Sequence, residues 1–235
     1  MNVKDKNIII TGGSLGIGKE TARALSLKGA NVLITGRSEK RLLDAKNYTQ
    51  SKIIEFDISN HDNIAFKARK CVDILEGRVD VLINNAGVGV RKSIEELNIN
   101  DFLKVFNVNV FGLALFTKEI IPSMIKQSNG TIINIGSTAS LKGYKNGSIY
   151  SSSKFAVRCL TQCWQAELRQ HNIRVCQVNP SEVTTAFGSL KRVERENIYN
   201  KLTPKEISHS IVSAIEMDNR GFINELNIWA TNPFD

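Results

Sequence analysis

Three side chains in the second half of the chain have the types and the spacing of a proton-transfer site. Tyr150 follows Ser137 by thirteen positions, and Lys154 follows Tyr150 by four. Residues four apart share one face of a helix, so the phenol and the ammonium are expected about one turn apart. A phenol with a pKa near ~10 is a poor acid or base at neutral pH, and a neighbouring ammonium favours its ionised form. Taken alone, the pair also describes a surface Tyr beside a solvated Lys.

A glycine-rich turn follows the first apolar strand and opens a helix. It reads Thr11-Gly12-Gly13-Ser14-Leu15-Gly16-Ile17-Gly18. Its glycines allow a tight turn and a close approach of the backbone to a pyrophosphate, which the free amides at the helix start then face. The spacing G-x-x-x-G-x-G differs from the more usual G-x-G-x-x-G, but the position between a strand and a helix is the required one. The residues predicted to bind here are Gly12, Ser14, Leu15, Gly16, Ile17 and Gly18.

The end of the second predicted strand indicates which dinucleotide would bind. A site that prefers NAD usually places an acid here, which accepts a hydrogen bond from the ribose 2′-hydroxyl. This chain has Thr35-Gly36-Arg37-Ser38, with no acid. A guanidinium can pair with a 2′-phosphate through charge-assisted hydrogen bonds, so Arg37 and the missing carboxylate both favour NADP(H). The alternative is an Arg at the start of a helix that faces solvent.

Two more turns follow the third and fourth predicted strands. Asp57 and Ile58 come after the third, where an Asp can accept from an adenine amino group. The fourth ends in Asn84-Asn85-Ala86-Gly87, whose small residues let the backbone lie close to a cofactor. Ordinary turns would use the same residue types. The predicted cofactor contacts from these turns are Asp57, Ile58, Asn85, Ala86 and Gly87.

Short apolar segments rich in β-branched residues alternate with helical segments along the chain. The predicted strands are Asn7–Thr11, Asn31–Thr35, Lys52–Phe56, Val79–Asn84, Gly130–Gly136, Ile173–Val178 and Glu225–Ala230. The predicted helices are Ile17–Lys28, Glu39–Gln50, Asp62–Leu75, Asn100–Lys126, Ile149–Gln170 and Pro204–Met217. The fully apolar runs Ile8–Ile10 and Val81–Ile83 suit a sheet covered on both faces. This alternation predicts an α/β protein, a single-domain Rossmann fold with a doubly wound, seven-stranded parallel sheet flanked by helices.

Size and composition fit one domain spanning residues 1–235, of which 42% are hydrophobic. No apolar run of 18 residues is present and the N-terminus lacks the flanks of a signal peptide, so we predict a cytoplasmic protein without a membrane span. The formal net charge of +8 would suit nucleic acid, membrane headgroups or an acidic carrier protein. The Lys and Arg residues are dispersed among acids, however, and no nucleic-acid-binding motif accompanies them, so no nucleic-acid partner is predicted.

The four cysteines and three histidines do not have the spacing of a metal site. Cys71, Cys159, Cys163 and Cys176 form no C-x-x-C pair, and the histidines are scattered. We predict reduced thiols and no bound metal.

Together these motifs resemble the classical short-chain dehydrogenase/reductase family, over essentially the whole chain. The T-G-x-x-x-G-x-G pattern lies at Thr11–Gly18, and the N-N-A-G pattern lies at Asn84–Gly87. The family's catalytic Asn, Ser, Tyr and Lys correspond to Asn109, Ser137, Tyr150 and Lys154. The resemblance implies hydride transfer between C4 of a nicotinamide and the carbon of a carbonyl or secondary alcohol.

The resemblance also implies a role for each of these four residues. Tyr150 would donate its proton to the developing alkoxide as a general acid, while Ser137 holds the same oxygen. Lys154 would lower the pKa of the phenol and hold the hydroxyls of the nicotinamide ribose. Asn109, expected within a long helix, would anchor a water that links Lys154 to solvent.

The segment after the sixth predicted strand departs from the family pattern. The family usually has Pro-Gly there, whereas this chain has Asn179-Pro180-Ser181-Glu182. By the resemblance, Pro180, the backbone of Val183 and the hydroxyl of Thr185 would hold the nicotinamide end of the cofactor. Ser181 has less backbone freedom than glycine. Glu182 adds a charge without an assigned role, and a solvent-facing side chain is its simplest interpretation.

Substrate choice belongs to Thr138–Ile149 and to the irregular stretch Ala186–Leu202, which is predicted to be a mobile loop or a small helix. Apolar residues there, such as Phe187, alternate with cationic ones, which suits an acyl chain on an acidic acyl carrier protein or on coenzyme A. Overall similarity is greatest to 3-oxoacyl-(acyl-carrier-protein) reductase-type members, by analogy. The alternatives are a reductase or dehydrogenase of sugars, polyols or other small ketones, and a non-catalytic cofactor-binding regulator.

The resemblance implies a homo-oligomer as well. Relatives usually assemble as dimers or tetramers through the two long helices, which here are Asn100–Lys126 and Ile149–Gln170. A homotetramer is therefore expected.

Overall fold

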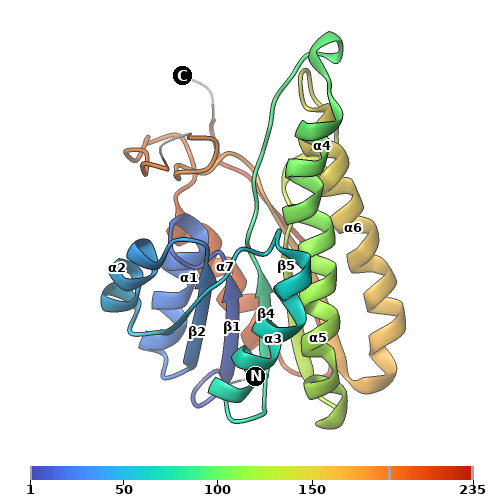
Figure 1. Cartoon of the computed structure of the whole chain (residues 1–235). Helices are drawn as coiled ribbons and strands as arrows, with labels where there is room; N and C mark the ends of the chain where they lie inside the picture. Colours follow the sequence, from blue (N-terminus) through green and yellow to red (C-terminus); the bar gives the residue numbers. More distant parts are fainter. Residues whose placement is uncertain (1, 190–191, 234–235) are drawn as a thin grey trace.

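The computed structural model describes residues 2–189 and 192–233, which are built around a parallel sheet of seven strands (Figure 1). The strands are β1 (Asn7–Thr11), β2 (Asn31–Gly36), β3 (Lys52–Glu55), β4 (Val81–Asn84), β5 (Gly130–Ile135), β6 (Ile173–Pro180) and β7 (Glu225–Ile228). Their order is β3-β2-β1-β4-β5-β6-β7, and every neighbouring pair is parallel. The chain winds from the centre to one edge and returns through β4 to the other, which is the doubly wound order predicted from the sequence.

Helices cover both faces of this sheet. They are α1 (Gly16–Leu27), α2 (Glu39–Thr49), α3 (Ile64–Ile74), α4 (Ile99–Phe106), α5 (Leu113–Lys126), α6 (Ser148–Leu168) and α7 (Pro204–Glu216). Buried side chains of α1, α2 and α7 pack on one face, and those of α3, α5 and α6 pack on the other. The resulting three layers bury the central strands β1, β4, β5 and β6 almost completely, while the edge strands β3 and β7 stay partly exposed.

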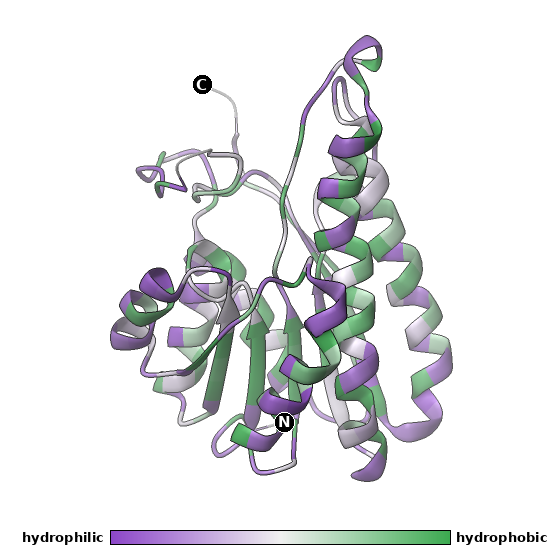
Figure 2. Ribbon diagram, viewed as in Figure 1, coloured by the Kyte–Doolittle hydropathy of each residue, from purple (hydrophilic) through white to green (hydrophobic). Residues whose placement is uncertain are grey.

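The fully apolar strands are explained by these two helical layers. Side chains of a strand alternate between the two faces, so Ile8 and Ile10 join the core beside α1 and α7, and Ile9 joins the core beside α3 and α5. All three are 0% exposed, and burial of each stabilises the fold by about 1.5–3 kcal/mol. Figure 2 shows the same pattern, with hydrophobic residues concentrated on the strands and on the helix faces that cover them.

The long helix predicted at Asn100–Lys126 is wrong in one respect, because a π-helical turn, Asn107–Gly112, separates α4 from α5. Two contacts with the segment after β3 accompany this turn. The ring of His61 forms a hydrogen bond of 3.0 Å with the carbonyl of Asn107. Gly112 packs so closely on Ile58 that a Cβ would overlap the Ile58 carbonyl. Single π turns of this kind are frequent at functional sites.

The other element boundaries differ from the predicted ones by a few residues at most. β6 extends two residues beyond its predicted end because Pro180 still pairs with Ile228 of β7. The third and fifth predicted helices are slightly too long, since 3₁₀ turns at His61–Asn63 and Arg169–His171 replace their outer ends. Differences of this size are ordinary at element ends.

The helical run Ile99–Lys126 is long and apolar enough, by length and composition, to cross a membrane. It is also the central helix of the layer that packs on β4 and β5. Phe116, Ile120 and Met124 are 0% exposed and belong to the core cluster on that face. We therefore interpret the run as a core helix.

Candidate active site

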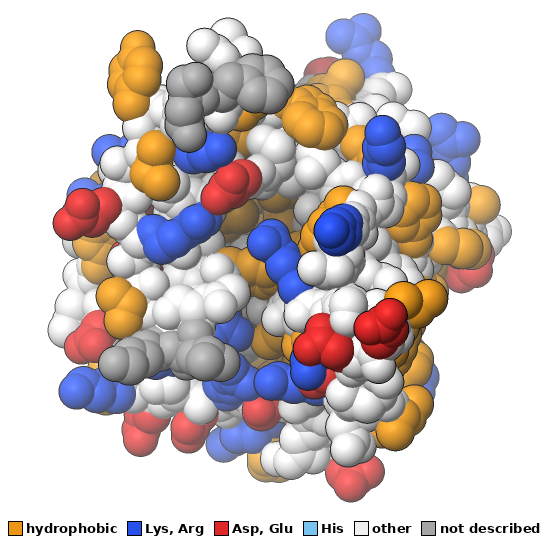
Figure 3. All heavy atoms as spheres, turned by 90° about the horizontal axis from the view of Figure 1, so that it is seen from above, with side chains coloured by type: hydrophobic (Ala, Val, Ile, Leu, Met, Phe, Trp, Pro, Cys, Tyr) orange, Lys and Arg blue, Asp and Glu red, His pale blue; other side chains and the backbone are white. Residues whose placement is uncertain are grey.

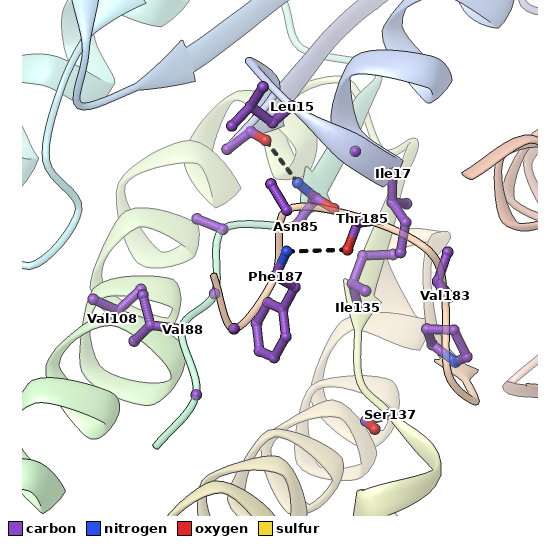
Figure 4. A pocket seen from close by; sticks show the side chains of 18 of the residues that line it. Leu15, Ile17, Asn85, Val88, Val108, Ile135, Ser137, Val183, Thr185 and Phe187 are labelled. Atoms are coloured by element: carbon purple, nitrogen blue, oxygen red, sulfur yellow. Dashed lines mark hydrogen bonds between the residues drawn. The ribbon is translucent and has the colours of Figure 1, made fainter. Parts of the chain in front are cut away.

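The carboxyl ends of the strands open into a cleft of about 1050 Å³ (Figure 4). Open parallel sheets bind ligands at this edge, where the strand order reverses between β1 and β4. The predicted site residues that line the cleft are Gly12, Ser14, Leu15, Gly16, Ile17, Arg37, Asp57, Ile58, Asn85, Ala86, Gly87, Ser137, Tyr150, Lys154, Pro180, Val183 and Thr185. The two other predicted residues, Gly18 and Asn109, do not line the cleft and lie buried beneath its lining.

The turn after β1 has a backbone shape that glycine adopts readily. Gly12 and Gly16 have φ angles of +66° and +52°, in the left-handed region. A Cβ at Gly12 would lie 2.8 Å from the Cα of Ala86, so the two turns touch backbone to backbone. α1 starts with a Leu15 N-cap that makes no side-chain bond, and its first turn holds no acid. Its amides therefore remain for an anion from outside the helix, and this cradle fits the pyrophosphate of a dinucleotide.

Polar side chains tie this turn to the one after β4. Thr11 Oγ1 accepts hydrogen bonds from the backbone amides of Asn85 and Ala86, each of 3.1 Å. Asn85 Nδ2 donates to the carbonyls of Thr11 (3.0 Å) and Gly12 (2.9 Å). A Cβ at Gly18 would overlap the Asn85 amide. The Thr-Gly and Asn-Ala-Gly motifs thus form one unit, in which Gly18 permits close packing.

Ser137, Tyr150 and Lys154 meet beyond the end of β5, on the opposite side of the cleft from Arg37. Tyr150 and Lys154 lie on one face of α6, as predicted, with Lys154 Nζ 5.9 Å from the centroid of the phenol ring. Lys154 is 5% exposed and donates a 2.7 Å hydrogen bond to the carbonyl of Ile135. Burial lowers the pKa of its ammonium to about 8.

The groups that shift the pKa of the Tyr150 phenol in this structure do not include Lys154. Burial raises the pKa of Tyr150 to about 12, and a hydrogen bond with Ser137 opposes the rise. The cation that also opposes it is Arg91, which the sequence analysis missed. The physical reason is that the Lys154 ammonium turns toward the Ile135 carbonyl and is itself destabilised by burial. At neutral pH the phenol therefore holds its proton.

Asn109 lies in the π-helical turn, and its side-chain amide forms hydrogen bonds with the protein backbone. Oδ1 accepts from the amide of Val88 (2.9 Å), and Nδ2 donates to the carbonyl of Val88 (2.9 Å) and to Ser153 Oγ (3.0 Å). Both donors of the amide are thus used within the chain. Asn109 acts as a positioning residue that fixes the segment after Gly87 against α6.

A buried polar cluster behind Ser137 is a second feature that the sequence analysis missed. Asn179 Oδ1 accepts from the amide of Ser137 (3.1 Å), from Ser140 Oγ (3.1 Å) and from Gln177 Nε2 (2.7 Å). Its Nδ2 donates to Asn227 on β7 (2.8 Å). Asn179 is 0% exposed. The available signal was an Asn that directly precedes Pro180 at the end of a strand whose eight residues are all buried.

Replacing Asn179 by Ala is expected to destabilise the fold and to lower turnover. The change removes the acceptor of Gln177 Nε2 and one of the two acceptors of the Ser137 amide and of the Ser140 hydroxyl, at about 1–3 kcal/mol for each group that finds no new partner. Urea unfolding at pH 7.5 measures the loss, and Asn219→Ala, an exposed site, is the matched control. An unfolding free energy equal to that of the control would show that the cluster is not structural.

The segment after β6 follows an ordinary path despite its departure from the family pattern. Ser181 is not among the described residues with positive φ, and its amide donates to the carbonyl of Ile228 (2.8 Å). Glu182 is not simply solvent-facing, because it pairs with Arg195 (3.1 Å) and Lys201 (3.4 Å). The hydroxyl of Thr185 accepts from the amide of Phe187 (3.2 Å), as Figure 4 shows.

The stretch 186–202 contains no helix among its described residues, and residues 190–191 lie outside them. It folds back over the cleft and returns to Leu202, which bridges Val183. The ring of Phe187 lies 5.5 Å from that of Tyr150 and also contacts Gly89. Phe187 therefore forms an apolar wall beside the phenol.

Positive charge surrounds the opening of the cleft. The Lys and Arg residues among the described lining residues are Arg37, Arg41, Arg91, Lys142, Lys154, Arg192 and Arg195, against the acids Asp57 and Glu182. Figure 3, which looks down on this edge of the sheet, shows Lys and Arg side chains around the hollow. This excess favours an anionic ligand.

Groups of three or more His, Cys, Asp or Glu residues that could hold a metal ion do not occur among residues 2–189 and 192–233. All four cysteines are free thiols. Cys71 and Cys176 are buried, which raises the pKa of each to about 12. The chemistry of the cleft rests on the groups described above.

Comparison with known proteins agrees with this geometry. Residues 6–196 match the family model for short chain dehydrogenases, and the chain belongs to that family. An uncharacterized oxidoreductase of Staphylococcus saprophyticus is 31% identical over 235 residues, covering 97% of this chain and 98% of the relative.

Two solved structures resemble the chain over nearly its whole length. An alcohol dehydrogenase from the archaeon Thermococcus sibiricus, complexed with 5-hydroxy-NADP, superposes with a TM-score of 0.86 at 26% identity, covering 96% of this chain and 97% of the other. A metagenomic short-chain oxidoreductase in complex with NADP superposes with a TM-score of 0.84 at 28% identity, covering 97% and 99%. The chain is thus an oxidoreductase whose fold binds a nicotinamide cofactor.

Proposed function

We propose that the protein is an NADP(H)-dependent enzyme that transfers hydride between the nicotinamide and a carbonyl or secondary alcohol carbon. The observation that carries this is the presence in one cleft of a glycine cradle for pyrophosphate and of Ser137, Tyr150 and Lys154. A non-catalytic, cofactor-binding regulator would not need this triad, so the regulator is the weaker alternative.

Several observations favour NADP(H) over NAD(H). Arg37 and Arg41 line the cleft at the end of β2, where no acid is present to bind a 2′-hydroxyl. Guanidinium groups are suited to phosphate through charge-assisted hydrogen bonds. The two solved structures described above hold NADP or its 5-hydroxy derivative.

The residues of the chain divide the work of proton transfer and orientation. The bound nicotinamide supplies the hydride in reduction and accepts it in oxidation. Tyr150, whose phenol is protonated at neutral pH, donates its proton to the substrate oxygen. Ser137 holds the same oxygen, and Asn179 fixes the backbone of Ser137. Lys154, with a pKa of about 8, places a cation beside the phenol and the ribose hydroxyls.

The proposed substrate is a 3-oxoacyl thioester. Phe187 gives the cleft an apolar wall beside Tyr150, and Arg91 and Lys142 give its rim positive charge. An acyl chain joined to an anionic carrier, such as coenzyme A or an acidic acyl carrier protein, matches this combination. Small ketones, sugars or polyols are the alternative, which the likeness to an alcohol dehydrogenase supports.

The initial rate of NADPH oxidation with a short 3-oxoacyl thioester tests this proposal, beside NADH and a panel of ketones and sugars. We expect thioester turnover with NADPH at least about tenfold faster than with NADH, as the loss of one charge-assisted contact implies. Turnover of another carbonyl alone would overturn the substrate and keep the catalytic assignment. Binding of NADPH without turnover of any carbonyl would favour the regulator.

We propose further that the protein is a cytoplasmic homo-oligomer, a dimer or tetramer, without nucleic-acid or membrane partners. Exposed apolar side chains gather on α4, on α6 and on the π-helical turn, among them Leu103 (44% exposed), Phe111 (45%) and Phe155 (42%). Such side chains are suited to an interface between copies of the chain. The mass of the protein in solution, measured by light scattering, decides between monomer and oligomer.

A further inference from the structure

The amide at the start of α1 is bonded to a carboxylate from a distant part of the chain. Glu194 Oε1 accepts from the amide of Gly16 (3.1 Å), and Oε2 accepts from Lys19 Nζ (3.2 Å). Burial alone would raise the pKa of Glu194, but the Gly16 amide and Lys19 outweigh it and hold that pKa below its usual value. Glu194 is therefore a bound anion at the N-terminus of the helix.

This carboxylate takes up an amide of the turn that is expected to hold the pyrophosphate. Gly16, the second glycine of that turn with left-handed φ, lines the cleft, and its amide donates to Glu194. Two anions that share one backbone donor repel each other at close range. Glu194 and a dinucleotide pyrophosphate thus exclude each other at Gly16.

Two residues earlier, Arg192 joins the guanidinium groups at the other end of the cofactor site. It lines the cleft with Arg37 and Arg41, and it adopts a φ of +53°, which is uncommon for a residue other than glycine. Burial and the charges of Arg37 and Arg41 lower the pKa of Arg192. The ion pairs made by the described residues include neither Arg37 nor Arg192. Like charges gathered in this way are stabilised by an added anion.

Arg195 anchors the segment that contains Arg192 and Glu194, through contacts that do not involve Glu194. Its guanidinium donates to the carbonyls of Val183 (2.7 Å) and Thr185 (3.3 Å) and pairs with Glu182 (3.1 Å). Release of Glu194 from Gly16 therefore leaves the segment anchored over the cleft, with Arg192 still near Arg37.

We propose that the segment Arg192–Glu194 selects between the two nicotinamide dinucleotides: Glu194 competes with the pyrophosphate of either one, and Arg192 supplies a third guanidinium that only a 2′-phosphate engages. The inference rests on the proposed function, because it assumes that the cleft binds a dinucleotide. Glu194 lowers the affinity for both cofactors alike, and Arg192 raises it for NADPH alone.

Equilibrium titration of NADPH and NADH, followed by dinucleotide fluorescence, tests both residues without reference to activity. Glu194→Gln is expected to tighten the Kd of both dinucleotides by about tenfold, because a neutral amide competes less well for the Gly16 amide. Arg192→Ala is expected to weaken NADPH by about tenfold and to leave NADH within about twofold. Arg192→Lys retains the charge and is expected to lie between Arg192→Ala and the unaltered chain.

Two surface variants are the matched controls. Glu196→Gln removes an acid two residues from Glu194 that takes part in none of the ion pairs of the described residues, and Arg220→Ala removes a cation that is 94% exposed. Both are expected to leave either Kd unchanged, and Tm values show that all variants are folded.

The outcomes separate the inference from the proposed function. Unchanged or weaker binding by Glu194→Gln would overturn the competition, and equal weakening of NADPH and NADH by Arg192→Ala would overturn the selectivity. In both cases the unaltered chain still binds a dinucleotide and the proposed function stands. Failure of the unaltered chain to bind either dinucleotide would overturn the proposed function itself.

Discussion

Replacing Tyr150 by Phe is expected to lower kcat for carbonyl reduction by about 10²–10⁴-fold while the affinity for NADPH changes little. The change removes the phenol proton of Tyr150, which forms a hydrogen bond with Ser137, and keeps the ring that packs on Phe187. The glycine turn and the arginines proposed to hold the cofactor line the cleft and are unaltered by this change. Stopped-flow measurement of NADPH oxidation, with a separate fluorescence titration of NADPH, gives both quantities.

Tyr144→Phe is the matched control for this change. Tyr144 also lines the cleft, where its ring lies 5.6 Å from the guanidinium of Arg91. Loss of the Tyr144 hydroxyl is expected to change kcat far less than loss of the Tyr150 hydroxyl. Turnover by Tyr150→Phe within tenfold of the unaltered enzyme would remove Tyr150 from the role of general acid.

Replacing Lys154 by Met is expected to lower kcat by about 10²-fold or more and to alter how stability depends on pH. The pKa of Lys154 falls from 10.5 to about 8 in the folded chain because of burial. Between these two values the unfolded chain binds more protons than the folded one, so this residue makes stability rise with pH. The full effect is on the order of 3 kcal/mol, and the Met variant lacks it.

Urea unfolding of both chains at pH 7.5 and pH 10 isolates this contribution. The raised pKa values of Cys71 and Cys176 act in the opposite direction above pH 9, but they act on both chains alike. We expect the unfolding free energy of the unaltered chain, relative to Lys154→Met, to increase by about 1–3 kcal/mol over this range. Lys40→Met, an exposed site on α2, should show no such difference. If the unfolding free energies of the unaltered chain and of Lys154→Met changed in parallel with pH, the pKa of Lys154 would not be lowered by burial.

The sheet and the cofactor cradle were predictable because local sequence determines them. Ile8–Ile10 must be covered on both faces, and the turn at Gly12 and Gly16 needs left-handed backbone angles. The spacing of Tyr150 and Lys154 on a helix fixed their common face. These features depend on residues that are close together in the chain.

Other features of the fold and the site depend on contacts between segments that are distant in the sequence, and local sequence patterns do not predict such contacts. The π-helical turn accompanies the contacts of Ile58 and His61 with residues about 50 positions later. Asn179 reaches Ser137 across neighbouring strands. The orientation of Lys154 was unpredictable for a similar reason, because its spacing from Tyr150 reveals the shared face but not that Nζ turns toward β5.

The π-helical turn at Asn107–Gly112 also links catalysis to the architecture of the core. A π turn amounts to one residue inserted into an α-helix, and each helical residue advances the helix by about 100°. If the same residues formed a regular α-helix, with none removed, everything after the turn would be rotated by about that angle. Phe116, Ile120 and Met124 would then swing away from the sheet. The π turn therefore lets the chain hold one extra residue beside Asn109 while the apolar face of α5 stays on the sheet.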